Sequence, residues 1–398
     1  MLLVVSDLHL TDAGSESTFR PDVFVRTIRE AARGARSVRL LLLGDIFEIL
    51  KSRVWEKNGV RPWEKKCTVV HQATVTEIFD RTLQTNAGFF EALAQLRDEL
   101  NMSIAYIPGN HDRPLNTEMG NGCRIRLRRL LKIEPEDDRL FVDFEKNDEY
   151  GVLAMHGHRW DEANSYGDDG TVAIGDFIVV DVVTRLPYVL AHHLNLSPTD
   201  ESLRFAFEID DVIPQTPVEM ARWLAHYVRA LSSHQAPRAL KSAIGQIAEE
   251  LEQQMNGYRF GSTLGRWWAK MLKGVAFDFA RTVDVVKWVR RASLRKPPAP
   301  PKYVDRAQFE LRGSGAPCNT VIFGHTHIPE HRTIWDGDRL QRYLNCGTWR
   351  RAHRATDFAI DGRSRYATVH VSAMVIVRTA AETTRSDPSY ELRQSYYA

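Results

Sequence analysis

Five short segments of this chain combine aspartate, asparagine and histidine, and each follows directly on an apolar run. In chain order they are Ser6-Asp7-Leu8-His9, Gly44-Asp45, Gly109-Asn110-His111-Asp112, His156-Gly157-His158 and Gly324-His325-Thr326-His327. The preceding runs, such as Leu40 to Leu43, have the length and composition of buried strands. Because ligands of open sheets collect beyond the carboxyl ends of the strands, five such strands can direct these side chains to one place. The pattern predicts a layered α/β fold with one composite site at that edge.

The side chains in these segments are ligands that suit manganese, iron or zinc, and the segments contain no thiolate. A single aspartate after a strand, such as Asp7, could equally cap a helix. However, Asp7 and His9 lie two positions apart on what we expect to be extended chain, so both point the same way. His325 and His327 repeat this spacing. The two pairs favour a metal site over helix capping.

The order and wording of these segments resemble the calcineurin-like metallophosphoesterase superfamily, except between His158 and Gly324. The resemblance implies a β-sandwich flanked by helices that binds two divalent metal ions, and we favour manganese over iron or zinc. It implies one metal held by Asp7, His9 and His327, a second held by Asn110, His156 and His325, and a bridging Asp45. Since Gly157 could let either neighbouring histidine approach a metal, His158 stays an alternative to His156, which we prefer.

The resemblance also assigns a catalytic role to His111, because the corresponding histidine of that family lies off the metals. We expect Asp112 to orient it. Two cations about 3.5 to 4 Å apart can share a bridging hydroxide and hold phosphate oxygens for in-line attack. Imidazole can stabilise the transition state or protonate the leaving oxygen, since its pKa lies near neutral pH. The predicted activity is therefore hydrolysis of a phosphomonoester, phosphodiester or pyrophosphate bond.

Within the superfamily, the motif sequences of this chain are most similar to those of the branch that contains UDP-2,3-diacylglucosamine hydrolase, which cleaves a pyrophosphate in lipid A synthesis. The chain departs from that branch in having His111 in place of an arginine and a longer segment before Gly324. We expect a nucleotide-linked or lipid-linked phosphorylated small molecule as substrate. One alternative is a nuclease, although a net charge of +2 gives no general preference for polyanions. A second alternative is a non-catalytic metal-binding scaffold, and the complete ligand set argues against it.

The segments and composition predict four regions. Residues 1–165 and 313–380 form the catalytic core, residues 166–312 a helical insertion that acts as a cap or lid, and residues 381–398 a polar, frayed tail. Charged residues interrupt the apolar stretch from Ile174 to Leu190, which is too short to cross a bilayer. Between Arg266 and Arg295, apolar and basic residues could contact an anionic membrane. An ordinary amphipathic helix packed on the core is the alternative that we favour.

Local patterns give further expectations. We predict helices over 22–32 and 87–100, a hairpin turn at 335–339 and a strand over 366–378. The four arginines between 124 and 131 either contact an anionic substrate or form a solvated helix face. The chain enters its first strand at once, which leaves no room for a signal peptide, and its four scattered cysteines predict reduced, mostly buried thiols. We therefore expect a cytoplasmic protein, with at most peripheral contact at the inner face of the membrane.

Overall fold

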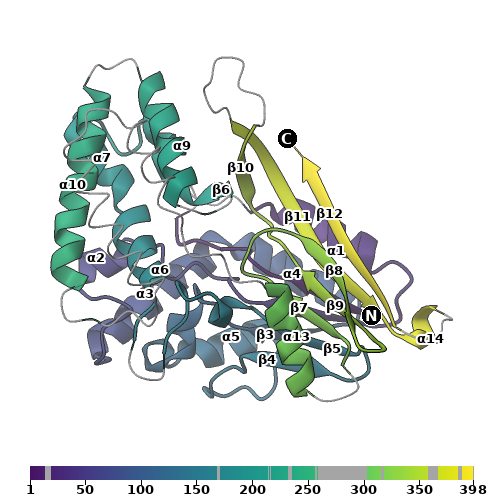
Figure 1. Ribbon diagram of the computed structural model, residues 1–398. Helices are drawn as coiled ribbons and strands as arrows, with labels where there is room; N and C mark the ends of the chain where they lie inside the picture. The colour runs from purple at the N-terminus through teal and green to yellow at the C-terminus, as the bar shows by residue number, and fades with distance from the viewer. Residues whose placement is uncertain are drawn as a thin grey trace.

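The computed structural model describes residues 1–13, 19–167, 171–213, 215, 217–231, 235–255, 258, 303–314, 318–356, 366–383 and 388–397. Two mixed β-sheets form its centre, and helices cover their outer faces (Figure 1). The α/β class predicted from the apolar runs is therefore confirmed. The amphipathic segment between Arg266 and Arg295 lies outside the described residues.

The first sheet contains seven strands and includes four of the predicted ones. Its order is β3 (Met102–Ile107), β2 (Val38–Leu43), β1 (Leu2–Val5), β11 (Tyr366–Arg378), β10 (Arg351–Ala355) and β6 (Val212–Ile213), and β12 (Ser389–Tyr397) pairs with β11. Strands β1, β2 and β3 are parallel, so their carboxyl ends share one edge. Strand β11 is long enough to pair antiparallel with β1 near its end and with β10 near its start.

The second sheet contains five strands in the order β4 (Phe144–Asn147), β5 (Val152–Met155), β7 (Thr320–Phe323), β9 (Arg339–Asn345) and β8 (Glu330–Asp336). Strands β5 and β7 are parallel, as are β7 and β9. Strands β8 and β9 form an antiparallel hairpin in which Asp336 pairs with Arg339. The turn predicted at 335–339 is thus confirmed.

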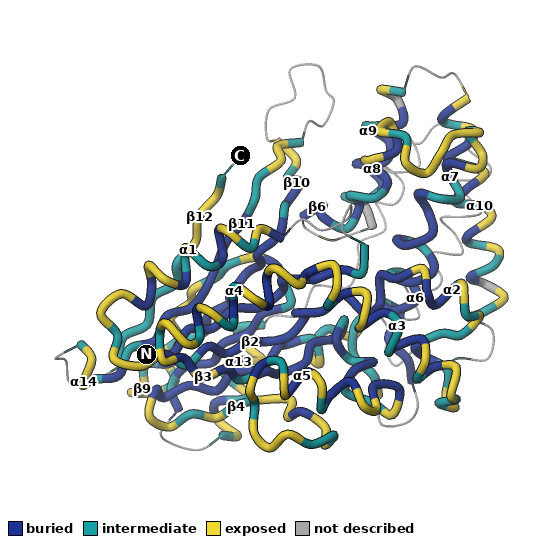
Figure 2. Tube along the Cα trace, turned by 180° about the vertical axis from the view of Figure 1, so that it is seen from behind, coloured by how far each residue is buried: buried dark blue, intermediate teal, exposed yellow. Residues whose placement is uncertain are grey.

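Both faces of the central strands are buried, which explains why these strands read as continuous apolar runs. Side chains of one strand alternate between the two faces of its sheet. One set packs between the two sheets and includes Leu2, Val4, Leu41, Leu43, Val152, Ala154, Ile322 and Leu344. The other set faces the helices and includes Leu3, Val5, Leu40 and Leu42. Figure 2 shows this buried centre as a continuous dark region beneath the partly exposed helices.

The helices over the first sheet are α1 (Pro21–Ala31), α3 (Val69–Thr85), α4 (Ala87–Glu99) and α5 (Cys123–Leu131). The short α2 (Val54–Asn58) and the 3₁₀ turns η2 (Arg113–Asn116), η3 (Glu118–Gly120) and η4 (His158–Trp160) lie in the connections, and α14 (Ala380–Thr383) follows β11. Helix α13 (Tyr303–Ser314) packs on the second sheet. The predictions for α1, α4 and β11 are confirmed, since each lies within about one residue of the predicted range.

The described part of the predicted insertion is mainly helical and has a hydrophobic cluster of its own. Up to Met255 it consists of α6 (Ile174–Phe177), the π-helical η5 (Ile178–Val183), α7 (Leu186–Leu194), η6 (Glu201–Leu203), α8 (Arg204–Phe207), η7 (Ile209–Asp211), β6, α9 (Pro217–Ala230) and α10 (Ala236–Met255). Helix α13 also begins within the predicted range 166–312, but it packs on the second sheet of the core. Strand β6 pairs in parallel with β10 of the core, so the insertion extends the first sheet (Figure 1). Within the described residues, no helix combines the length and apolar character needed to span a membrane.

The segment that we expected to fray at the end of the chain is instead a strand. Strand β12 pairs antiparallel with nine consecutive residues of β11. Its Tyr390 and Leu392 side chains pack against the cluster between the sheets, and the Tyr390 hydroxyl lies 2.9 Å from the Tyr150 carbonyl. The alternation of apolar and polar residues in this short segment therefore indicates its structure, a strand, better than its polar composition does. The cysteine prediction holds: the four thiols are free, and all but the half-buried Cys67 are buried.

Candidate metal centre

The predicted ligands follow the carboxyl ends of strands in both sheets. Asp7 and His9 come after β1, Asp45 after β2, Asn110 after β3, His156 after β5, and His325 and His327 after β7. Because the sheets pack face to face, these ends meet at one edge of the sandwich. The structure thus brings side chains more than 300 positions apart into contact, as the strand pattern predicted.

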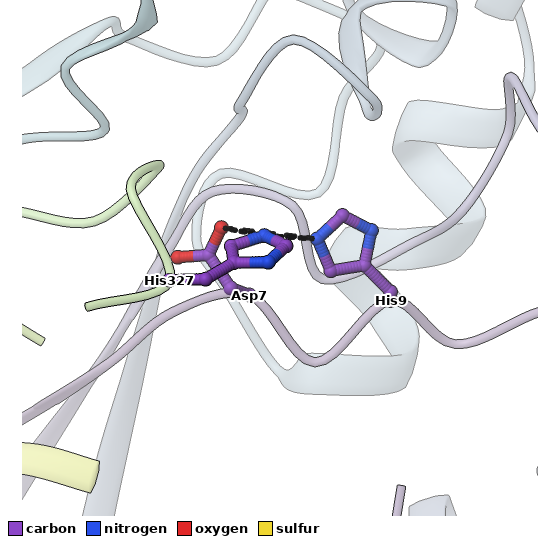
Figure 3. Close-up of side chains that lie close together, drawn as sticks. All are labelled: Asp7, His9 and His327. Carbon is purple, nitrogen blue, oxygen red and sulfur yellow. Dashed lines mark hydrogen bonds and ion pairs between the residues drawn. The ribbon is translucent and has the colours of Figure 1, made fainter. Parts of the chain in front are cut away.

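Asp7, His9 and His327 form the first group that could hold a metal ion, with ligand atoms all within 4.8 Å of one another (Figure 3). The Nε2 atom of His327 lies 3.1 Å from Oδ1 of Asp7, and the Nε2 atom of His9 lies 3.8 Å from it. All three side chains are buried. Three donors that converge on one buried point fit the first predicted metal.

Asp45, His156 and His325 form a second group by the same criterion. The Nε2 atom of His156 lies 3.1 Å from Oδ2 of Asp45, and the Nε2 atom of His9 lies 3.9 Å from the same oxygen. Asp45 also belongs to a third group with His9 and His111. Asp45 therefore lies between the ligand groups, where a bridging carboxylate must stand.

Hydrogen bonds to neighbouring groups fix the ring orientation of three predicted histidine ligands. Nδ1 of His156 donates to the carbonyl of Leu43 over 2.9 Å, and Nε2 of His325 lies 3.0 Å from Oδ2 of Asp161. Nδ1 of His9 donates to Glu48 over 2.7 Å. Such contacts orient histidine ligands in metal sites, because the remaining ring nitrogen is left as an acceptor for the metal.

Several buried atoms of the predicted ligands have no hydrogen-bond partner within the described part of the chain. They are Oδ1 of Asp7, Oδ1 of Asn110 and Nε2 of His156; the 3.1 Å contacts of Asp7 with His327 and of His156 with Asp45 lack hydrogen-bond geometry. A buried polar atom without a partner costs about 1 to 3 kcal/mol, so three together call for an explanation. A divalent cation would supply the missing partner, and this oxygen and nitrogen set suits manganese, iron or zinc. The residues present therefore fit the metals that the sequence implied.

The backbone at the centre corrects one part of the sequence argument. We expected extended chain at the two ligand pairs, but five predicted ligands have positive φ angles. The angles are 57° at Asp7, 47° at His9, 53° at Asp45, 69° at His325 and 58° at His327. Left-handed conformations are uncommon for residues other than glycine, and such strain gathers at functional sites. The pairs converge because the loops coil tightly after each strand.

Two glycines permit this tight arrangement. A Cβ atom on Gly109 would collide with the Oδ1 atom of Asp45 and lie 2.6 Å from its backbone nitrogen. Gly44 has a φ of 81°, and a Cβ atom there would collide with the ring of His156. Both glycines are needed so that neighbouring loops can approach each other around the centre.

The electrostatics of the centre keep its carboxylates ionised. Burial alone would raise the pKa of Asp7, but His156 and the contact with His327 lower it well below its usual range. Burial likewise opposes ionisation of Asp45, and His156 and His111 outweigh it and lower its pKa. Negative charge is thus retained in a buried place, which favours a cation there.

Glu48 has a central role that the sequence argument missed. Its Oε2 atom accepts from Nδ1 of His9, and its Oε1 atom accepts from Nδ1 of His111 over 2.6 Å. Its side chain is only 2% exposed, whereas that of His111 is 16% exposed. Glu48 therefore links a predicted metal ligand to the more accessible catalytic candidate. The sequence did carry a signal for this residue, because Glu48 stands three residues after Asp45 in the segment Gly-Asp-Ile-Phe-Glu.

Asp112 does not orient the ring of His111 as predicted, because that ring nitrogen contacts Glu48 instead. The carboxylate of Asp112 accepts from backbone N–H groups of Phe47, Gly109 and Ile46 over 2.7 to 3.2 Å. It therefore joins the loops after β2 and β3. Burial and the nearby Asp45 raise its pKa to about 6.

His111 is held next to the ligand groups through its backbone as well, since its N–H donates to Oδ1 of Asp45 over 2.8 Å. Burial alone would lower the pKa of His111, but Glu48 and Asp45 outweigh it and raise the pKa to about 10. His158 lies close by, with its ring centroid 5.5 Å from that of His156, but it belongs to none of the ligand groups found among the described residues. The structure thus brings His156 into the centre as we preferred.

The arginines of α5 fit neither of the alternatives that we gave for the four. Arg124 and Arg128 are buried and donate to backbone carbonyls, including those of Leu115 and Arg139. Arg126 and Arg129 are exposed and pair with carboxylates. Only the exposed pair matches a solvated face, because the other two satisfy carbonyls of the segments before and after the helix.

Comparison of the sequence with protein family models and with curated proteins gives no match. The chemical interpretation of the centre therefore rests on the residues and their geometry.

Proposed function

We propose that this protein is a binuclear metal-dependent phosphoesterase of the calcineurin-like metallophosphoesterase superfamily. The observation that carries the proposal is the position of Asp45, whose Oδ2 atom lies 3.1 Å from Nε2 of His156, assigned to one metal, and 3.9 Å from Nε2 of His9, assigned to the other. Two face-to-face sheets with helices outside also agree with the sandwich expected for that superfamily. The substrate that we propose is a nucleotide-linked or lipid-linked small molecule with a phosphoester or pyrophosphate bond.

The chain would hold one metal with Asp7, His9 and His327 and the other with Asn110, His156 and His325, and Asp45 would serve both. When bound, two divalent cations polarise phosphoryl oxygens and make water a competent nucleophile at neutral pH. His111 is placed to act on the phosphoryl group or the leaving oxygen. Glu48 and Asp45 favour the protonated imidazole and raise its pKa, and the protonated ring can donate a hydrogen bond or a proton there.

Glu48 would hold the His111 ring while leaving Nε2 free to meet the substrate, because Glu48 accepts from Nδ1. The same carboxylate keeps Nε2 of His9 facing Asp7. One buried residue thus aligns the metal ligand and the proton donor, and no protein nucleophile is needed.

Hydrolysis assays on metal-loaded protein test this proposal. Wild type should hydrolyse p-nitrophenyl phosphate or its bis-ester with added manganese, and His111→Ala should be slower by roughly 10²- to 10⁴-fold. His331→Ala is the matched control, since His331 is exposed on β8. Metal-loaded wild type that hydrolyses no phosphate ester would contradict the proposal. Degradation of plasmid or single-stranded DNA without turnover of the small esters would assign the centre to a nuclease instead.

A further inference from the structure

Buried ion pairs join the helical insertion to the core next to the metal centre. In one set, Asp181 of η5 pairs with Arg61 of the core over 2.9 Å. In a second set, core cations face carboxylates that follow α8 or lie in η7; its members are Lys51, Arg350, Arg351, Glu208, Asp210 and Asp211. The second set connects to Glu48, which orients His9 and His111.

Asp210 bridges two core cations with its two carboxylate oxygens. Nζ of Lys51 lies 3.0 Å from Oδ1, and Nη2 of Arg350 lies 2.8 Å from Oδ2. The side chains are 13%, 5% and 7% exposed for Asp210, Lys51 and Arg350 respectively. Water therefore screens these contacts little, and the carboxylate holds both cations in place.

Each of these two cations belongs to a loop of the metal centre. The backbone N–H of Lys51 donates to Oε1 of Glu48 over 3.0 Å. Arg350 lies two residues after Thr348, and the hydroxyl of Thr348 donates to the carbonyl of Asp7 over 2.8 Å. Asp210 thus connects the loop that carries Glu48 with the loop that supports Asp7, although Asp210 itself lies in the insertion.

We propose that Asp210 is a positioning residue that holds Glu48, and through it His9 and His111, so that the insertion completes the metal centre. This inference rests on the proposed function, because it concerns the same centre. Asp210 also balances the charge of Arg350, which would otherwise disfavour cations near His9. The insertion then does more than cover the site, since the alignment of the metal ligands depends on it.

The test compares manganese affinity in Asp210→Asn and Asp181→Asn, measured by calorimetry on metal-free protein. Asp181 is a matched control, because it too lies in the insertion and contacts two cations, Arg61 and Arg185, whereas Asp210 contacts Lys51, whose backbone N–H donates to Glu48. Loss of an outer partner of a metal ligand typically weakens binding about 10- to 100-fold, so we expect about tenfold for Asp210→Asn and less than about twofold for Asp181→Asn. Thermal unfolding checks that both variants fold.

A second variant, Lys51→Met, covers the case in which Asp210→Asn does not fold. It removes the link on the core side and leaves Arg350 paired with Asp210 and Asp211, so the same loss of affinity is expected. Unchanged affinity in folded Asp210→Asn or in Lys51→Met, or an equal loss in Asp181→Asn, would overturn the inference alone. Wild type that binds no manganese would overturn the proposed function and the inference together.

Discussion

The Nε2 atoms of His9 and His327 lie 3.1 Å apart, and both face Oδ1 of Asp7 (Figure 3). The Nδ1 proton of His9 is used by Glu48, so Nε2 of a neutral His9 carries a lone pair towards His327. Two imidazole nitrogens this close to each other and to a carboxylate need a cation or a proton between them. The arrangement is therefore one that metal binding stabilises.

Replacing His327 with alanine should weaken metal binding by more than the roughly 10- to 100-fold that loss of an outer partner costs, because a direct ligand is removed. Competition with a fluorescent chelator measures the effect. His331→Ala makes the same substitution at an exposed position on β8 and should leave metal affinity unaltered. Equal affinity in the two variants would remove His327 from the centre.

Glu48→Gln should lower metal affinity by about 10- to 100-fold. The amide is uncharged and has a single acceptor oxygen, so it cannot accept from both His9 and His111 as the carboxylate does. Turnover should fall as well, since His111 loses its partner. Glu30→Gln, an exposed change on α1, serves as control. A Glu48→Gln protein with wild-type affinity and turnover would contradict the role of Glu48.

Gly109→Ala should destabilise the fold by about 1 to 3 kcal/mol, because its methyl group meets both the side chain and the backbone of Asp45. Metal affinity should drop in the same variant, as Asp45 must shift. Gly88→Ala in α4 is the matched control, since nothing lies within 4 Å of its added Cβ atom. It should be neutral or slightly stabilising, as alanine favours helices, and chemical denaturation distinguishes the two.

Metal affinity should rise with pH between pH 7 and pH 9. Burial alone would lower the pKa of His156, but Asp45 raises it to about 9 in the metal-free protein. A metal must displace this proton, so affinity should increase by about tenfold per pH unit below that pKa and level off above it. Manganese titrations at several pH values, with an indicator dye to count released protons, measure this dependence. Affinity that stays constant from pH 7 to pH 9, without proton release, would contradict the assignment of His156 as a ligand.

The sequence predicted the parts of the centre that depend on strand position. Both faces of β1 and β2 are buried, so their apolar runs are visible, and the ligands follow at the strand ends. The left-handed backbone at Asp7 and His9 was not predictable from spacing, because it arises from contacts with loops distant in the sequence. The expectation of extended chain at these pairs is therefore wrong, although Asp7 and His9 do lie in one ligand group.

Residues whose roles depend on long-range contacts were also missed. Glu48 acquires its role only when the loop after β3 brings His111 to it. Asp210 acquires its contacts because β6 pairs with β10 and carries η7 towards Lys51. Strand β12 was missed for a related reason, since its partner β11 supplies the pairing that its own composition does not indicate.

Metal content is the measurement that tests the central claim most directly. Elemental analysis after reconstitution with manganese should give two metal ions per chain for wild type and for His111→Ala, because His111 is not assigned as a ligand. Asp45→Ala should lose both ions, since Asp45 lies within 4 Å of His9, assigned to one metal, and of His156, assigned to the other. Wild type without bound metal, or Asp45→Ala with two ions still bound, would contradict a binuclear centre built around Asp45.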